Sequence, residues 1–288
     1  AAFKAYVLWF PKQQWPLAIG FQMAAGGMGA LSATTPVEAA LQITDWRGVF
    51  TVLALLTLLV AVIIFLVVPE KPLEEKKESF GDQMHGVRQV FSSLEFWRTA
   101  PLTTMSQASF LSIQGLWTGP WLKDVAGLDR TAVARSLLWI AVAMIAGFIS
   151  LGTLAERLNR VGISSLATAV AGTCLFMMIQ AAIILGLGDS PMLLWIFFGF
   201  FGTSNIITYA SLSQRFPAEL SGRVTTGVNL LVFIAAFIGQ WAIGAIIGLW
   251  PVGENGSYAL HGYQAGFAVM LGTQVLCFIW FFIVSLRK

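Results

Sequence analysis

Eight apolar segments, each long enough to cross a bilayer as a helix, constrain this chain more than any other feature. A bilayer core of ~30 Å requires ~20 apolar helical residues. The segments are continuously apolar, as at 60–68, whereas a membrane β-barrel would show alternating stretches of ~10 residues. With only 11% charged residues, the composition lies far from that of a soluble domain. The sequence therefore predicts an all-α, polytopic membrane protein with eight transmembrane helices, at about 17–41, 48–68, 101–123, 131–154, 163–187, 192–214, 224–249 and 262–286.

Two parts of the sequence resemble each other at a separation of about 206 to 217 residues. The first copy contains Phe10, Pro11, Gly20, Gln22 and 46–50, and the second contains Phe216, Pro217, Gly227, Asn229 and 263–267. Four other apolar segments lie between the copies, which indicates a repeat of six helices. The chain is therefore expected to enter this repeat at the fifth helix and to lack the first four. Internal repeats of membrane helices are typical of secondary transporters.

The positive residues are distributed unequally between the two sides of this topology. One side receives 13 of the 17 Lys and Arg residues, and the other receives only Arg47, Lys123, Arg130 and Arg135. Because positive residues are enriched in cytoplasmic loops, we expect both termini and the long loop at 69–100 in the cytoplasm. We expect an integral protein of a bacterial inner (plasma) membrane.

Several classes of protein are disfavoured by the sequence. Cys174 and Cys277 lie in apolar segments without nearby metal-ligating partners. The glycines of 26–29 are not followed by the Lys-Ser/Thr pair of a phosphate-binding loop, which disfavours an ATP-driven pump. The net charge is only +3, with no basic and aromatic patch for nucleic acid. We therefore expect no enzyme activity, no cofactor and no metal, and a monomer whose partners are the lipid bilayer and a small solute.

The polar segment 69–100 divides the chain into three parts. Its first portion is charged, and its second portion is amphipathic around 87–97. We expect the second portion to form an interfacial helix, with its apolar face on acyl chains and Arg88 and Arg98 on headgroups. The predicted parts are the last two helices of an N-terminal bundle (1–68), a cytoplasmic linker (69–100) and a complete six-helix C-terminal bundle (101–288).

The segment after the fourth predicted helix carries a short motif. Its positions are Gly152, Leu154, Glu156, Arg157 and Arg160. This pattern resembles the major facilitator superfamily of transporters, whose halves each carry a cytoplasmic G-x-L-x-D/E-R-x-x-R/K signature between their second and third helices. The resemblance covers essentially the whole chain and implies that the visible helices are the fifth to the twelfth of twelve. It also implies that this loop is a conformational latch.

The motif residues have two interpretations. Gly152 is expected to allow close helix approach, and Glu156 to pair with Arg157 across the end of the bundle and to shift as the halves move. Alternatively, the basic residues only anchor the topology. Glu219 and Arg223, in the loop before the eleventh helix, are further candidates for a cytoplasmic gate or belong to an ordinary turn.

Polar side chains inside the predicted spans are candidates for the substrate cavity, because burying them in lipid is costly. The resemblance implies that the seventh, eighth, tenth and eleventh helices line the pathway. The alternative is that these side chains only join helices by hydrogen bonds. The candidates are Gln22, Gln107, Gln114, Trp117, Asn205, Thr208, Tyr209, Asn229 and Gln240.

Glu38 is the one acidic residue inside the predicted spans. It is a candidate for proton coupling if partial burial raises its pKa, or an end residue that meets water or Arg47. Glu38 is expected near the outer end of its span, and no charged residue lies at the middle of any predicted span. Groups that would clamp a charged solute are therefore expected on helices outside this chain.

The predicted function is a secondary active transporter that moves a small solute by alternating access, driven by an ion, proton or counter-substrate gradient. The segment 115–122 is weakly similar to bacterial sugar-phosphate and organic-anion permeases. The alternative is a non-transporting membrane receptor with a transporter fold. The substrate, the coupling ion and the direction of transport stay open, and we expect no coupled transport by the 288 residues alone.

Overall fold

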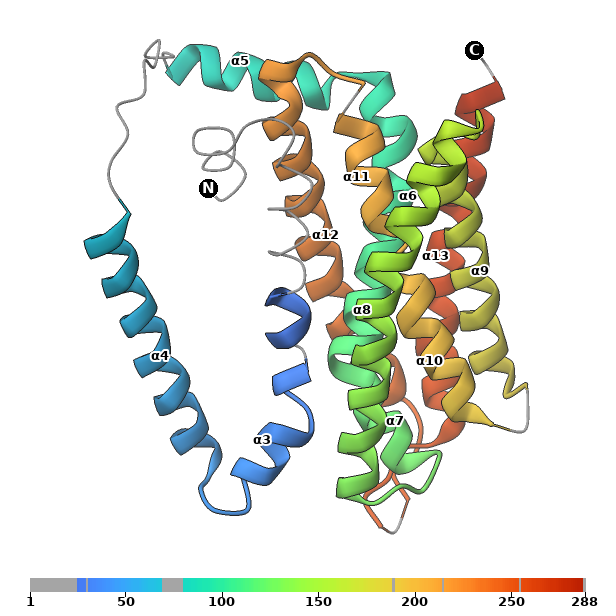
Figure 1. Cartoon of the computed structure of the whole chain (residues 1–288). Coiled ribbons are helices and arrows are strands. Elements are labelled where there is room, and N and C mark those ends of the chain that lie inside the picture. The colour runs from blue at the N-terminus through green and yellow to red at the C-terminus, as the bar shows by residue number, and fades with distance from the viewer. Residues whose placement is uncertain are drawn as a thin grey trace. The chain divides into compact units, whose positions relative to one another are not determined.

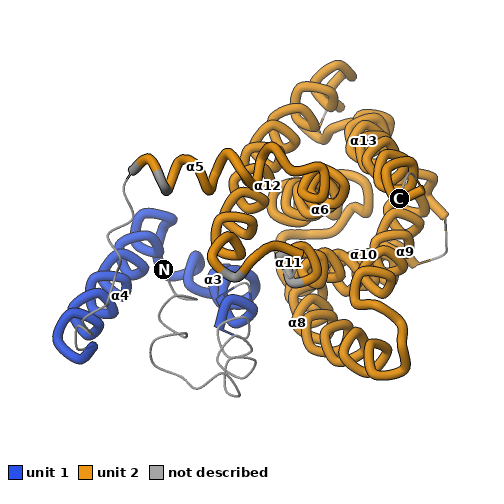
Figure 2. The backbone as a smooth tube through the Cα atoms, turned by 90° about the horizontal axis from the view of Figure 1, so that it is seen from above, with its two compact units in different colours: residues 1–78 blue, residues 79–288 orange. Residues whose placement is uncertain are grey.

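The computed structural model describes residues 25–29, 31–68, 80–187, 190–213, 215–253 and 255–286, and its regular elements there are all helical (Figure 1). The chain divides into two compact units, residues 1–78 and 79–288 (Figure 2). Six helices in the described residues are long and apolar enough to cross a membrane: Trp46–Val67, Arg130–Arg160, Ser165–Leu185, Pro191–Tyr209, Glu219–Ile247 and Leu260–Leu286. The all-α membrane fold is thus confirmed.

Unit 1 contains two described elements, α3 (Thr35–Ala40) and α4 (Trp46–Val67). The carboxylate of Asp45 caps α4 by accepting a hydrogen bond from the backbone N–H of Gly48 at 2.9 Å. Arg47 lies 4.5 Å from the ring centre of Trp46 and 3.7 Å from the Asp45 carboxylate. At 1.5 Å per residue, the 22 residues of α4 extend about 33 Å, which is enough for the core of a bilayer.

Unit 2 contains the remaining elements, which are α5 (Phe80–Phe91), α6 (Leu94–Ser112), η2 (Ile113–Trp117), α7 (Thr118–Asp124), α8 (Arg130–Arg160), α9 (Ser165–Leu185), α10 (Pro191–Gly202), α11 (Asn205–Ser213), α12 (Ala218–Ile247) and α13 (Leu260–Leu286). Its long helices run side by side as a bundle, with α6 in the interior (Figures 1 and 2). Two passes are interrupted, one by the π-helical turn η2 and one between α10 and α11.

The number of apolar spans differs from the predicted eight for two reasons. The expected span at 17–41 lies partly outside the described residues. The expected span at 101–123 is present as a continuous helical stretch from α6 through η2 to α7, but its many Ser, Thr and Gln residues make it too polar to count as a membrane span by composition. A polar helix in the interior of a bundle is protected from lipid by its neighbours.

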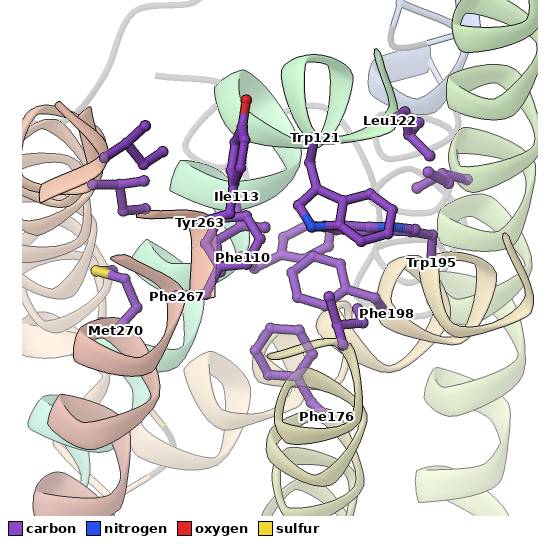
Figure 3. Close-up of a cluster of buried hydrophobic side chains, with 14 residues drawn as sticks. Phe110, Ile113, Trp121, Leu122, Phe176, Trp195, Phe198, Tyr263, Phe267 and Met270 are labelled. Carbon is purple, nitrogen blue, oxygen red and sulfur yellow. The ribbon is translucent and has the colours of Figure 1, made fainter. Parts of the chain in front are cut away.

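Aromatic side chains from several helices fill one core of unit 2 (Figure 3). Phe198 of α10 lies between Phe176 and Phe110, with ring centres at 4.9 Å and 5.7 Å. Trp121 and Trp195 meet at 5.3 Å in an edge-to-face arrangement. Such pairs add a specific geometry to the burial of apolar area.

Glycines let α8 and α10 approach closely. A Cβ atom on Gly147 would lie 2.4 Å from the carbonyl oxygen of Phe200, and one on Gly199 would lie 2.9 Å from the carbonyl oxygen of Ile140. Small residues at such contacts are typical of membrane helix pairs. At each glycine, the facing backbone carbonyl therefore comes closer than any larger residue would allow.

The amphipathic helix α5 packs on α12 instead of presenting its whole apolar face to lipid. A Cβ atom on Gly86 would lie 2.8 Å from Nη1 of Arg223. Val90 is fully buried in a second core, the α12 cluster, which consists of Val90, Phe96, Ala100, Leu212, Leu220, Val224, Val228 and Val232. Of the apolar residues predicted to face lipid at 87–97, Val87 stays exposed on α5, and Leu94 and Trp97 stay exposed at the start of α6. The helix α5 therefore belongs to unit 2.

Candidate functional site

A charged cluster at the start of α6 joins this helix to the segment before α12. Glu95 forms an ion pair with Arg98, with 2.9 Å between the carboxylate oxygen and the guanidinium nitrogen, and also pairs with Arg215. Arg98 is only 7% exposed, so its predicted position on lipid headgroups is wrong. A guanidinium group is removed from water here because a carboxylate neutralises it at short range.

The first interrupted pass brings two of the predicted cavity residues, Trp117 and Gln240, into contact. Trp117, the last residue of η2, donates its indole N–H to the backbone carbonyl of Gln240 on α12 at 3.1 Å. Gly115 leaves room for the Gln240 amide, since a Cβ atom there would lie 3.8 Å from its Nε2. Gln114 and Gln240 are both half-buried. The result is a polar patch on α6–η2 and α12 that is neither fully enclosed nor fully open.

The π-helical turn changes the spacing on which the sequence argument relied. In an α-helix, residues three and seven apart lie on nearly one face. A π turn contains one more residue than an α-helical turn. The α-helical spacing therefore does not predict that Trp117 lies on the same side of the helix as Gln107 and Gln114. The side chain of Gln107 is half-buried, and its Oε1 is enclosed without a hydrogen-bond partner among the described residues.

The second interruption, at Thr203 and Ser204, separates α10 from α11. The Thr203 hydroxyl donates to the carbonyl of Phe200 at 2.7 Å, which satisfies one acceptor at the broken end. Ser204 is fully buried, and its side chain fills the space above Gly172 of α9. The break thus lies inside the bundle, where its polar groups are protected from lipid.

Asn205 and Thr208 form a buried network at the start of α11. The Thr173 hydroxyl donates to the side-chain oxygen of Asn205 at 3.1 Å, and the Thr103 hydroxyl lies 2.9 Å from that of Thr208. The network joins α11 to α6 and α9. In this structure, these two predicted cavity residues therefore act as hydrogen-bonded contacts between helices.

The other predicted cavity residues are dispersed. Tyr209 packs against the α12 cluster. Asn229 is exposed on α12, about 16 Å along the helix from Gln240 at 1.5 Å per residue. Gln22 lies outside the described residues.

A buried triad of polar side chains was missed by the sequence argument. Gln274 of α13 donates to the hydroxyl of Ser109 at 2.9 Å and to the side-chain oxygen of Gln180 at 2.7 Å. Gln180 of α9 donates to the same hydroxyl at 3.0 Å. Gln107 was selected because it is an amide side chain inside an apolar span. Gln180 and Gln274 meet the same criterion, so the sequence contained the signal that identifies them.

Replacing Gln274 by leucine should destabilise unit 2 by about 1 kcal/mol, because interhelical hydrogen bonds in membranes contribute on this order. Thr273→Val is the matched control, since the bond of the Thr273 hydroxyl, to the carbonyl of Met270, stays within its own helix among the described residues. Thermal unfolding in detergent micelles, followed by circular dichroism, measures both variants. Equal stability of the two variants would contradict a structural role for the triad.

The motif residues lie on a helix, where a loop was expected. The helix α8 continues to Arg160, and Gly162 follows with a positive φ of 91° that suits the end of a helix. Glu156 pairs with Arg160 at 2.6 Å on the exposed surface of α8, and not with Arg157. A Cβ atom on Gly152 would meet no described atom within 4 Å, so the expected close helix approach is absent from the described part of the chain.

The remaining charged candidates lie near helix ends. Glu219 is in the first turn of α12, and its backbone carbonyl accepts a hydrogen bond from Arg223 at 3.4 Å. Glu38 lies in the first turn of α3 in unit 1. No group of three or more His, Cys, Asp and Glu residues in the described ranges could hold a metal ion.

Together, the apolar helices and the polar groups enclosed between them define an integral membrane protein. The family model described as "Major Facilitator Superfamily" matches residues 1–240. The chain belongs to the Major Facilitator Superfamily. A search of the curated proteins found no match.

Proposed function

We propose that this protein moves a small solute across the membrane by alternating access, driven by an ion, proton or counter-substrate gradient. Unit 1 would contribute helices of the N-terminal bundle, and unit 2 would be the C-terminal six-helix bundle. Membership of the superfamily supports transport in general. The single observation that carries the proposal for this chain is the interruption of two membrane passes at polar positions.

Interrupted helices suit a solute site because they free backbone and side-chain polar groups in the middle of a membrane. Single π turns occur frequently at functional sites, and discontinuous helices form the binding sites of many transporters. The two interruptions are close together in unit 2, since the ring of Phe110, three residues before η2, lies against Gly202 at the end of α10. We therefore place the solute path beside η2.

The candidate residues take different roles in this proposal. Gln107, Gln114, Trp117 and Gln240 would contact the solute, because their side chains are only partly buried. Asn205 and Thr208 would hold the broken pass in place. The charged cluster of Glu95, Arg98 and Arg215 would act with Glu219 and Arg223 at the cytoplasmic gate, and Glu38 is the candidate for coupling.

Replacing Gln114 by leucine should slow uptake about tenfold, the factor that corresponds to one lost hydrogen bond of about 1.4 kcal/mol. The assay uses the full-length protein in proteoliposomes, with radiolabelled solutes and imposed proton, sodium or counter-solute gradients. Gln89→Leu is the control, because Gln89 is exposed on α5 and is not part of a membrane span.

Two results would contradict parts of this proposal. Accumulation of no solute under any gradient would favour a non-transporting receptor. Uptake with equal rates for Gln114→Leu, Gln89→Leu and the unmodified protein would keep transport but reject the solute path beside η2.

A further inference from the structure

An apolar groove lies between α6 and α13, away from the polar patch at η2. Its volume is about 350 Å³, and it is lined by Trp97, Pro101, Leu276, Cys277 and Trp280. This volume falls within the ~300–1,000 Å³ typical of sites for small molecules. Nearly all of the surface that lines the groove is apolar.

One wall of the groove contains Pro101, a residue without a backbone N–H donor. Proline has no N–H, so Pro101 inside α6 leaves the carbonyl of Trp97, four residues earlier, without its usual helical partner. The indole N–H of Trp280 on α13 donates to this carbonyl at 2.7 Å. Pro101 therefore leaves the Trp97 carbonyl free to accept a hydrogen bond from Trp280, and this bond fixes the Trp280 ring on the opposite wall of the groove.

The second indole ring is also held within the protein. Trp97 donates its N–H to the carbonyl of Phe91 at 2.7 Å and packs edge-to-face on Phe96 with ring centres at 5.4 Å. Interfacial tryptophans commonly direct their polar edge to the wet side of the membrane. Here both N–H groups are already satisfied by carbonyls. The two rings are thus fixed as apolar walls before anything binds, and such preorganisation favours binding.

The position of the groove identifies what occupies it. Leu276 is 68% exposed and Trp280 is 44% exposed on α13, a membrane-crossing helix. Trp280 lies six residues before the end of α13, about 9 Å along the helix at 1.5 Å per residue. The surrounding medium at this depth is the hydrocarbon of the bilayer. We infer that the groove binds one acyl chain of a phospholipid, independently of any solute that the protein transports.

The experiment is photo-crosslinking of the full-length protein in liposomes of phosphatidylethanolamine and phosphatidylglycerol, doped with a phospholipid that carries a diazirine on its acyl chain. Mass spectrometry of the peptides should locate the adducts at 97–101 and 276–280 in preference to the exposed apolar surface around Trp139 of α8. Cys277→Phe fills the groove and should lower these adducts about tenfold, because displacing two methylene groups corresponds to roughly that factor.

Cys174→Phe is the matched control, since Cys174 is also a partly buried free cysteine but lies on α9. It should leave the adducts at the groove unchanged. Trp280→Phe is a second variant, which removes the donor to Trp97 and should also lower the adducts, so the test does not depend on the folding of Cys277→Phe. Adducts spread evenly over the exposed apolar helices, or an absence of lipid adducts at 97–101 and 276–280, would overturn the inference.

Discussion

Replacing Gly147 by leucine should destabilise unit 2 by about 3 kcal/mol, the upper end of the usual cost of overpacking. The first added carbon would lie 2.4 Å from the carbonyl oxygen of Phe200 and 2.6 Å from the Thr203 hydroxyl oxygen. The backbone carbonyl cannot rotate away without breaking α10, so α8 and α10 would have to separate. Thermal unfolding in detergent micelles, with circular dichroism as the signal, measures the loss.

Gly152→Leu is the matched control on the same helix. No described atom lies within 4 Å of a Cβ atom at this position. Because glycine inside a helix costs about 0.5–1 kcal/mol relative to alanine, the variant should be at least as stable as the unmodified protein. A loss as large as that of Gly147→Leu would instead support the close approach that the motif predicts for Gly152.

Glu95→Gln should destabilise the protein by about 3 kcal/mol, because removing one partner of a buried ion pair leaves the other charge without compensation. The side chain of Arg98 is 8% exposed and that of Glu95 is 18% exposed. Arg215 is more accessible and can turn towards water, whereas Arg98 cannot. Urea unfolding of the purified protein in mild detergent measures the change.

Glu156→Gln provides the control for the same chemical change. The pair of Glu156 with Arg160 also joins a glutamate to an arginine on one helix, but both side chains are mostly exposed. Exposed pairs of this spacing contribute about 0.3–0.5 kcal/mol, so the loss should stay near that value. Equal effects of the two substitutions would show that Arg98 is not buried in the folded protein.

The helices were predictable because apolar segments of this length have few alternatives in a membrane. The predicted span at 48–68 agrees with α4 within two residues at its start. The end of α8 was not predictable from hydropathy, since its last turn carries Glu156, Arg157 and Arg160 on an exposed surface. Polar residues at a helix end resemble a loop in composition, although their backbone is helical.

The candidate site was only partly predictable. The search for amide side chains within apolar spans located Gln240, whose amide lies near Gly115 of η2. The π turn and the break at Thr203 and Ser204 depend on packing between helices, which leaves no local pattern in the sequence. The burial of Arg98 depends in the same way on Glu95 and on Arg215, which is 120 residues from Glu95.

The break between α10 and α11 also has a mechanical consequence. The half α10 is fixed to α8 through Gly147 and Gly199, whereas the half α11 is fixed to α6 and α9 through Thr208 and Asn205. An unbroken helix would transmit any tilt of α8 rigidly to α6, because its ladder of hydrogen bonds resists bending. At the break, the backbone N–H groups of Thr203 and Ser204 bond to carbonyls three residues earlier instead of four, so the helix axis can change direction at this point. Phe198 still holds α10 against Phe176 of α9 and Phe110 of α6, so any change of direction is confined to the break.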